Sequence, residues 1–287
     1  MANKTIIAVA VLILAVVCIA GAYVIFNNGD SKESVTINAA GSTTVEPLMV
    51  GFQEEYEKQH KNVSINVSAA GSGTAAPALR NGTAHIGMLS RELNASESDL
   101  RPIVIAGDCV VIIVDKRAGV TNLSLEQLAK IYKGDYKNWK EVGGNDLAIS
   151  PIIRESTSGT RTCIDEAMAG VLKISVTDLS VNYSKYSTQG STGAMQTQVK
   201  NVQGSIGYVN LGNIPSLDSA TQVVSINGVM PSKTSALDGT YKVSRNLLLA
   251  TIGEPTGEIK AFLDWILSPK GQKIVEKEGF VPIGPTS

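Results

Sequence analysis

Hydroxyl side chains gather in three separate glycine-containing segments of this 287-residue sequence. The segments are 41–44, 71–74 and 158–160, and Arg154 stands shortly before Ser158. Serine and threonine hydroxyls can each donate a hydrogen bond, and an arginine guanidinium can donate two parallel hydrogen bonds to a pair of oxygens. The sequence therefore predicts a site that binds a small oxyanion through neutral donors and one cation.

Each hydroxyl segment lies between a predicted strand and a predicted helix. The three strands are 35–38, 63–67 and 149–153. The helix after the first strand has Pro47 in its first turn, and the other two helices are 75–80 and 160–168. In the first helix Leu48, Phe52 and Tyr56 recur every four residues, as on a buried helix face. Strands that alternate with helices are typical of an α/β fold with a mostly parallel sheet, in which ligands bind beyond the carboxyl ends of the strands.

The start of a helix also favours an anion. Its first backbone N–H groups have no partner within the helix and carry a partial positive charge. Serine and threonine at such a position are also ordinary helix caps, which is the commoner role for any single turn. Three such turns facing one cleft would form an oxyanion cage, and this combination favours a binding site.

Composition limits the classes of function. With 18% charged residues and a formal net charge of -1, the chain has no basic stripe that would bind nucleic acid, so no nucleic acid partner is expected. The spacing of histidine, cysteine and carboxylate residues indicates no metal site, and we expect no cofactor. The 43% apolar fraction and 27 glycines are typical of a folded α/β protein.

An apolar run at 6–26 has the length of a membrane helix, since about 21 helical residues span roughly 30 Å of hydrocarbon. Lys4 on the short side favours an N-terminus inside and the rest of the chain outside. We therefore expect 1–30 to be a membrane anchor or signal with a linker, and the folded residues to lie on the outer face of the cytoplasmic membrane. A cleaved signal that releases the protein, or lipid attachment at Cys18, is the alternative.

Two cysteines, Cys109 and Cys163, lie in the folded part. They could bond to each other, but they form neither a disulfide framework nor a metal-binding spacing, and two buried thiols are the simpler interpretation. Asn-x-Ser/Thr triplets agree with an exported chain if the organism glycosylates asparagine. The triplets begin at Asn62, Asn66, Asn81, Asn94, Asn122 and Asn182.

The stretch 154–161 has the arrangement RxxxSGT and resembles the signature of the phosphate-binding proteins of high-affinity phosphate ABC importers. Segments 41–47, 71–74 and 86–91 resemble the phosphate loops of that family, in the family's order. Similar segments outside the site are 132–134, 139–144, 206–208, 268–271 and 279–282. The resemblance covers nearly everything after the linker.

The resemblance implies a two-lobed periplasmic-binding-protein type II fold with a hinged central cleft that closes around one dehydrated phosphate. It implies delivery of that phosphate to the permease of an ABC transporter with its cytoplasmic ATPase, and we expect a monomer. The implied phosphate-binding residues are Ser42, Thr43, Thr44, Ser72, Ser90, Arg91, Arg154, Ser158, Gly159 and Thr160.

One departure from the family concerns selectivity. Well-studied members place an aspartate in the third loop to accept the proton of phosphate, whereas this chain has Ser90 followed by Arg91. Sulfate has nearly the same size but no such proton, and leaving a buried acceptor unpaired costs about 1 to 3 kcal/mol. Because a serine adds no charge repulsion, we expect weak pH dependence, with Arg91 compensating in affinity.

The apolar stretch 103–116 is long enough to leave one lobe and enter another, and a return is predicted near 217–226. On this interpretation the first lobe combines 35–107 with 222–287, and the second lobe is 108–221. An amphipathic helix pair near the C-terminus, broken at Ser268 and Pro269, is interpreted as a packing element.

Other functions fit parts of the pattern. Helix starts and hydroxyls would serve sulfate, molybdate or tungstate as well, and an anchored receptor or adhesin could keep the fold but bind a protein. A hydrolase with Ser158 as its nucleophile has little support, since neither His60 nor His85 comes with a motif that pairs it to Ser158. We therefore expect a binding protein and not an enzyme.

Overall fold

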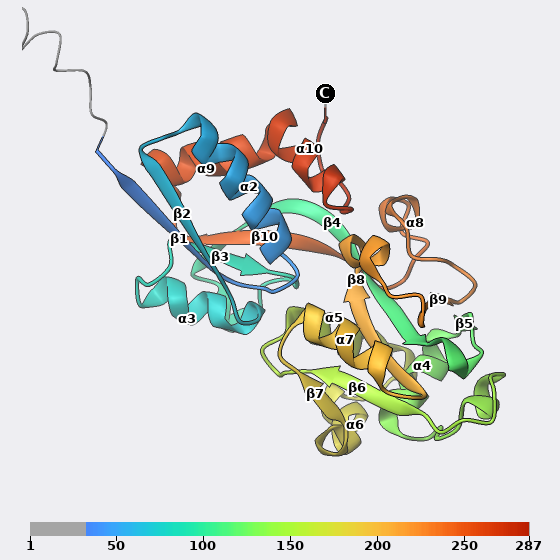
Figure 1. The fold of residues 1–287 in the computed structure, drawn as a ribbon. Coiled ribbons are helices and arrows are strands. Elements are labelled where there is room, and N and C mark those ends of the chain that lie inside the picture. The colour runs from blue at the N-terminus through green and yellow to red at the C-terminus, as the bar shows by residue number, and fades with distance from the viewer. Residues whose placement is uncertain (1–32, 287) are drawn as a thin grey trace, which may run out of the picture. The chain divides into compact units, whose positions relative to one another are not determined.

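The strands of the protein join into one mixed sheet in the computed structural model, which describes residues 33–286 (Figure 1). The strands are β1 (Val35–Gly41), β2 (Val63–Ala69), β3 (Ile86–Leu89), β4 (Leu100–Asp115), β5 (Asn122–Leu123), β6 (Ser150–Arg154), β7 (Ser187–Gln189), β8 (Ser205–Asn210), β9 (Thr221–Ile226) and β10 (Ser244–Ile252). Their order is β2-β1-β3-β10-β4-β8-β6-β7, and β9 pairs with β4 and β5.

Helices connect most of these strands. They are α2 (Glu46–Gln59), α3 (Ala75–Arg80), α4 (Leu125–Lys133), α5 (Gly159–Leu172), α6 (Val176–Leu179), α7 (Thr192–Asn201), α8 (Lys233–Leu237), α9 (Gly257–Leu267) and α10 (Pro269–Lys277). The α/β class predicted from the sequence is confirmed, and so is the strand, turn and helix order around each hydroxyl segment. The C-terminal helix pair also breaks at Ser268, as predicted.

The sheet is less parallel than expected. β1 pairs in parallel with β3, and β6 pairs in parallel with β7 and β8. Between these two groups, β10 is antiparallel to both β3 and β4, and β4 is antiparallel to β8. The sheet is mixed because two long strands cross its middle in opposite directions, which no local periodicity could indicate.

β4 takes part in both halves of the sheet. Its first part, from Leu100 to Cys109, pairs with β10, while its last residues pair with β8 on one side and β9 on the other. The side chains of 110–114 are fully buried. A strand covered on both faces is apolar without alternation, which explains the continuous apolar run in the sequence.

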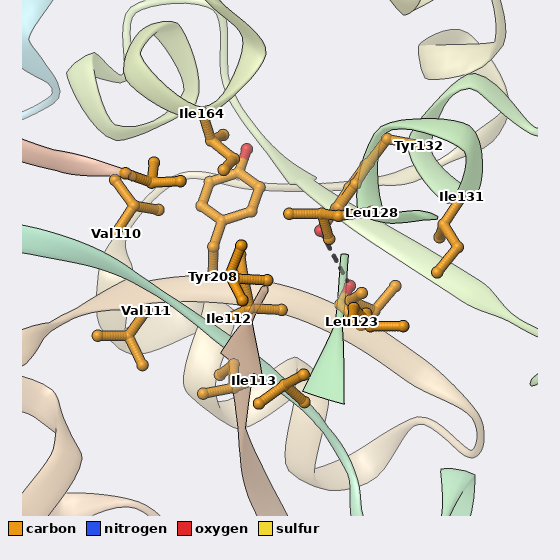
Figure 2. Packing of buried hydrophobic residues seen from close by; sticks show 14 of the residues in the cluster. Val110, Val111, Ile112, Ile113, Leu123, Leu128, Ile131, Tyr132, Ile164 and Tyr208 are labelled. Atoms are coloured by element: carbon orange, nitrogen blue, oxygen red, sulfur yellow. Dashed lines mark hydrogen bonds between the residues drawn. The ribbon is translucent and has the colours of Figure 1, made fainter. Parts of the chain in front are cut away.

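Two hydrophobic clusters lie along β4. The larger one combines the last part of β4 with α4, α5, α7, β8 and β9, and Figure 2 shows some of its members, among them Ile112, Leu128, Ile164 and Tyr208. The smaller one packs α3 against β3, β10 and the first residue of β4. Figure 1 shows α3 on one side of these strands and α2 with α9 on the other.

α2 buries the stripe that the sequence predicted. Leu48, Phe52 and Tyr56 are all buried, and the Tyr56 ring packs against Phe262 and Trp265 of α9, with ring centroids 4.8 and 5.4 Å apart. Aromatic pairs at these separations stabilise the packing of the two helices beyond the area they bury.

A strand occupies part of the stretch 217–226, where the sequence predicts the return to the first lobe, and the lobe boundaries remain a prediction. This strand, β9, pairs with Ile112 to Asp115 of β4, and Val224 and Ile226 belong to the larger hydrophobic cluster. The strand that pairs with the first part of β4 is β10, which begins at Ser244. The larger cluster also includes Val243, the residue just before β10.

Two expectations about export remain predictions. Within residues 33–286, no helix is both long enough and apolar enough to cross a membrane. The anchor predicted at 6–26 and the lipid attachment predicted at Cys18 lie outside the described residues.

Cys109 and Cys163 are both free thiols, and burial raises the pKa of Cys109 to about 12.

Candidate functional site

The carboxyl ends of two pairs of parallel strands place the polar loops. β1 ends at Gly41 and its parallel neighbour β3 ends at Leu89, so Ser42 and Ser90 each follow directly after a strand. β6 ends at Arg154, whose register partner in β7 is Gln189. The loops that the sequence singled out therefore start where parallel strands end, which is where α/β sheets bind ligands.

Gly41 is required for the first loop to approach its neighbour. Its φ is +140°, and a Cβ at this position would lie 2.2 Å from the carbonyl oxygen of Met88. The amide of Ser42 donates to that same oxygen at 2.8 Å. Glycine thus lets β1 turn into a loop that lies directly over the end of β3.

Hydroxyls from distant loops meet in what we call the hydroxyl cluster, made of Thr43, Thr44, Ser72, Ser90 and Thr160. The Oγ1 atoms of Thr44 and Thr160 lie 3.1 Å apart, and the Oγ atoms of Ser72 and Ser90 lie 3.2 Å apart. The backbone amide of Ser90 donates to the Ser72 hydroxyl at 3.0 Å. Each of these five residues is at most 8% exposed, so the cluster is closed to bulk water.

Gly159 lies against this cluster from the start of α5. A Cβ on Gly159 would come within 2.4 Å of the Ser72 hydroxyl and 2.8 Å of the Ser90 hydroxyl. Helix α5 offers no carbonyl to its first amides, so the N–H groups of Gly159 and Thr160 remain free of intrahelical bonds. The absence of a side chain brings these amides next to the serine hydroxyls.

Arg154 joins the hydroxyl cluster through its guanidinium, which is almost fully buried. Nη2 donates to the hydroxyl of Thr43 at 3.0 Å, across 111 residues of sequence. The edge formed by Nε and Nη2 faces Glu155, with Nε 2.8 Å from Oε2 and Nη2 2.7 Å from Oε1. The cation is therefore fixed on one edge by a carboxylate and turned toward the hydroxyls on the other.

The backbone of Arg154 is held as firmly as its side chain. Its amide donates to the Tyr208 hydroxyl at 2.9 Å, and its carbonyl accepts from Nη1 of Arg161 at 3.0 Å. Burial raises the pKa of Tyr208 well above its ordinary value, so this hydroxyl stays protonated. Arg161 itself is also paired with Asp165 and therefore supports the site without entering it.

Two of the predicted hydroxyls act as local turn and cap groups. The Ser158 hydroxyl accepts from the amide of Arg161 and is the N-cap of α5, and the Ser42 hydroxyl accepts from the amide of Thr44 at 3.1 Å. Neither α2 nor α3 has a side-chain cap. Capping therefore accounts for Ser158, but it does not account for Thr43, Thr44 or Ser72.

Arg91 does not join the hydroxyl cluster, contrary to the expectation from the sequence. Its two terminal nitrogens each lie 2.7 Å from a different oxygen of Glu97, and Nη1 also donates to the carbonyl of Glu92. Hydrogen bonding to Arg91 holds the pKa of Glu97 below its usual range. A bidentate carboxylate partner six residues away therefore holds this guanidinium, and its role as a compensating cation remains a prediction.

Thr192 is a site residue that the sequence reasoning missed. It is the first residue of α7 and is 4% exposed, and its hydroxyl accepts from Nη1 of Arg154 at 3.2 Å. The signal was present, because residues 190–192 repeat the Gly-Ser-Thr of 41–43 after another strand. That strand, β7, has only three residues, too few for a recognisable alternation.

A pocket of about 1000 Å³ lies beside the cluster and not on it. Gly73 and Thr157 separate the two, and the amide of Gly73 donates to the carbonyl of Thr157 at 2.8 Å. Of the predicted site residues, Arg91 alone lines this pocket. The size of an open space is a weaker guide here than the convergence of donors, because a dehydrated ion needs contact on all sides.

The described residues contain no group of three or more histidine, cysteine or acidic side chains that could hold a metal. The histidines lie apart from Ser158: the His60 ring stacks on Tyr56, and Nδ1 of His85 accepts from the amide of Asn38. The arrangement thus offers hydroxyl, amide and guanidinium donors, but within residues 33–286 no base is paired with a nucleophile.

Comparison with known proteins finds relatives along almost the whole chain. A family model described as the PBP superfamily domain matches residues 27–270. The phosphate-binding protein PstS of Borreliella burgdorferi is 31% identical over 261 residues, which cover 89% of this chain and 92% of the relative. PstS of Bacillus subtilis is 30% identical over 263 residues, covering 89% and 83%.

A solved structure of an ABC transporter substrate-binding protein from Clostridium perfringens, with bound phosphate, is also similar. It superimposes with a TM-score of 0.79 at 32% identity and covers 87% of this chain and 100% of the solved one. The family resemblance noted in the sequence is therefore confirmed over both strands and loops. This chain belongs to the PBP superfamily and, within it, to the phosphate-binding proteins.

Proposed function

We propose that this chain captures inorganic phosphate outside the cytoplasm and delivers it to the permease of an ABC importer. The observation that carries the proposal is the meeting of Thr43, Ser72 and Thr160 with Arg154 in a buried cluster, within a chain related to proteins that bind phosphate. The relatives named PstS support phosphate over the other tetrahedral oxyanions considered from the sequence.

Capture replaces the water around the anion by fixed donors. The hydroxyls of the cluster contact one another or Arg154, and Gly159 at the start of α5 lies against two of them, so one ion placed among these groups would accept from all of them. Hydrogen bonds to a charged group each stabilise a complex by about 1.5 to 3 kcal/mol, which offsets the cost of dehydrating the ion.

The charge balance of the site favours reversible binding. Arg154 contributes one positive charge, but Glu155 lies against it at 2.7 Å, so the pair is formally neutral. The anion is then held mainly by oriented dipoles, whose effect is strong because the cluster is buried. A neutral cage releases its ion once the donors separate, as delivery to a permease requires.

The site lies between two groups of loops, and we propose that these belong to two lobes. Residues 42–44, 72 and 90 come from the half of the sheet that contains β1 and β3, and residues 154 and 158–160 come from the half that contains β6. We propose that the chain passes from the first lobe to the second within β4 and returns to the first lobe near Val243. The apolar N-terminus would hold the protein at the outer face of the membrane, and we expect the chain to act without catalysing a reaction.

Isothermal titration of the purified chain with phosphate, sulfate and molybdate tests this function. Phosphate should bind most tightly. The variant Arg154→Ala should weaken phosphate binding by roughly 10- to 150-fold, because it removes hydrogen bonds from a charged donor. The matched control is Arg101→Ala, since Arg101 is an exposed arginine paired with Glu254 at the surface.

The control variant should bind phosphate as the original chain does. Tighter binding of sulfate or molybdate than of phosphate would overturn the proposal in favour of another oxyanion. Unchanged affinity in Arg154→Ala would show that phosphate binds elsewhere on the protein.

A further inference from the structure

Thr192 accepts a hydrogen bond from the Arg154 guanidinium, as Thr43 does. Thr43 precedes Arg154 in the sequence, and Thr192 follows it. Nη1 of Arg154 donates to Thr192 Oγ1 at 3.2 Å, and Nη2 donates to Thr43 Oγ1 at 3.0 Å. The two hydroxyls lie 3.4 Å from each other. Both threonines are buried, at 4% and 8% exposure, so two hydroxyls flank the cage-facing edge of one guanidinium.

The fold brings Thr192 to this place through strand register. Arg154 and Gln189 are paired residues of the parallel strands β6 and β7, and the carbonyl of Gln189 accepts from both the amide of Glu155 and Nε of Arg154. The chain then turns through Gly190 and Ser191 into α7. The segment from Gln189 to Thr192 thus wraps the guanidinium from Nε to Nη1.

Most N–H groups of the Arg154 guanidinium already have partners within the protein. A guanidinium has five N–H groups. Within the described part of the chain, Nε donates to Glu155 and Gln189, the two hydrogens of Nη2 go to Glu155 and Thr43, and one hydrogen of Nη1 goes to Thr192. One hydrogen of Nη1 is left for a ligand, and Thr192 holds the nitrogen that carries it.

The hydroxyl of Thr192 also has a proton to donate. Its oxygen accepts from Arg154, and its nearest hydroxyl neighbour, Thr43 Oγ1, lies at 3.4 Å, well beyond the usual 2.7 to 2.8 Å of an O–H···O bond. Such a long contact is weak, so a closer oxygen would compete for the proton. An anion beside Nη1 would supply that oxygen.

We propose that Thr192 is a phosphate-binding residue, which donates its hydroxyl proton to an oxygen of the bound anion and orients Nη1 of Arg154 toward the same anion. This inference rests on the proposed function. It adds a fourth threonine to Thr43, Thr44 and Thr160, the threonines implied by the family resemblance, from a loop that none of those motifs includes.

Isothermal titration with inorganic phosphate, on the purified full chain, tests the inference. Thr192→Val keeps the branched shape but removes the hydroxyl, and it should weaken phosphate binding tenfold or more. Thr192→Ser restores a hydroxyl and should bind within about threefold of the original chain. Thr197→Val is the matched control, because Thr197 lies exposed on the same helix and its hydroxyl bonds only to the carbonyl of Gly193. It should bind as the original chain does.

The melting temperature without phosphate separates binding from folding. All three variants should melt close to the original chain, and if Thr192→Val melts lower, Thr192→Ala provides the same comparison without a second methyl group. Binding by Thr192→Val within threefold of the original chain would overturn the inference, and so would equal weakening in Thr192→Val and Thr192→Ser. If the original chain itself fails to bind phosphate, the proposed function falls, and the role of Thr192 falls with it.

Discussion

Small side chains and hydroxyls have separate roles at this site. Gly41 and Gly159 allow close approach, since a Cβ on either would meet an atom of another segment within 2.4 Å. Ser72, Ser90 and the threonines supply donors at the positions where the loops meet. Arg154 adds the single cation, with Glu155 and Thr43 holding its two edges. Glycine is therefore needed where two segments approach closely, and hydroxyl and guanidinium side chains are needed where hydrogen bonds are donated.

At this scale, the expected selectivity between phosphate and sulfate depends on Ser90. Its hydroxyl lies 3.2 Å from that of Ser72 and is almost completely buried, and it stands where the resembling family has an aspartate. A hydroxyl can rotate to donate or to accept, whereas a carboxylate can only accept. We therefore expect sulfate to be disfavoured only by the loss of one acceptor contact and not by charge repulsion.

We predict that phosphate is preferred over sulfate by roughly 5- to 150-fold, the equivalent of one unpaired buried acceptor. The preference should change little with pH, because a serine hydroxyl stands where the resembling family has an aspartate. Competition titrations of phosphate against sulfate across the neutral pH range measure both quantities. Tight phosphate binding that is wholly insensitive to sulfate would contradict a serine as the discriminating acceptor.

At the scale of elements, the start of α5 brings several donors to the hydroxyl cluster. Its cap, Ser158, is satisfied by the amide of Arg161, which leaves the amides of Gly159 and Thr160 at the positive end of a 14-residue helix. The helix lies against the second and third loops through Gly159, and against the first loop through the contact of Thr160 with Thr44. One helix start therefore contacts three loops.

Gly159→Ala tests this contact. Because the added Cβ would lie 2.4 Å from the Ser72 hydroxyl, the loops must separate, and phosphate binding should weaken tenfold or more in titration calorimetry. Gly170→Ala is the matched control on the same helix, since a Cβ there meets nothing within 4 Å. The control should keep its affinity and gain up to about 1 kcal/mol of stability, because alanine favours the helix. Equal affinities for the two variants would exclude a tight contact at Gly159.

At the scale of the whole molecule, β4 links the two groups of loops. Asp108, in the middle of β4, is fully buried and lies 2.7 Å from Nη2 of Arg245 in β10, while its other oxygen accepts from the amide of Leu211. Nη1 of Arg245 donates to the carbonyl of Ser90. The crossing strands are thus connected to the third loop by one buried ion pair.

Closure around the ion should be measurable in solution. Donors from both groups of loops must surround one phosphate, so small-angle X-ray scattering should report a smaller radius of gyration when phosphate is added. Arg154→Ala should show no such change at the same phosphate concentration. An unchanged radius in the original chain, under conditions where calorimetry shows binding, would exclude a hinged closure.

Local sequence patterns alone predicted many of the helices of this protein and the segments that carry its hydroxyl side chains. The apolar stripe at Leu48, Phe52 and Tyr56, the helix at 75–80 and the break at Ser268 all agree with the structure, because helix periodicity and helix ends depend on neighbouring residues. The hydroxyl segments were also recognisable from the sequence, since each follows a strand and precedes a helix.

Only the tertiary structure decided which of these groups meet. Arg91 follows Ser90 in sequence but bonds to Glu97, whereas Thr192 lies 38 residues from Arg154 and contacts it directly. The antiparallel insertion of β10 between β3 and β4 was equally hidden. Strand pairing and the direction of a long side chain depend on partners far along the chain, and no local pattern contains them.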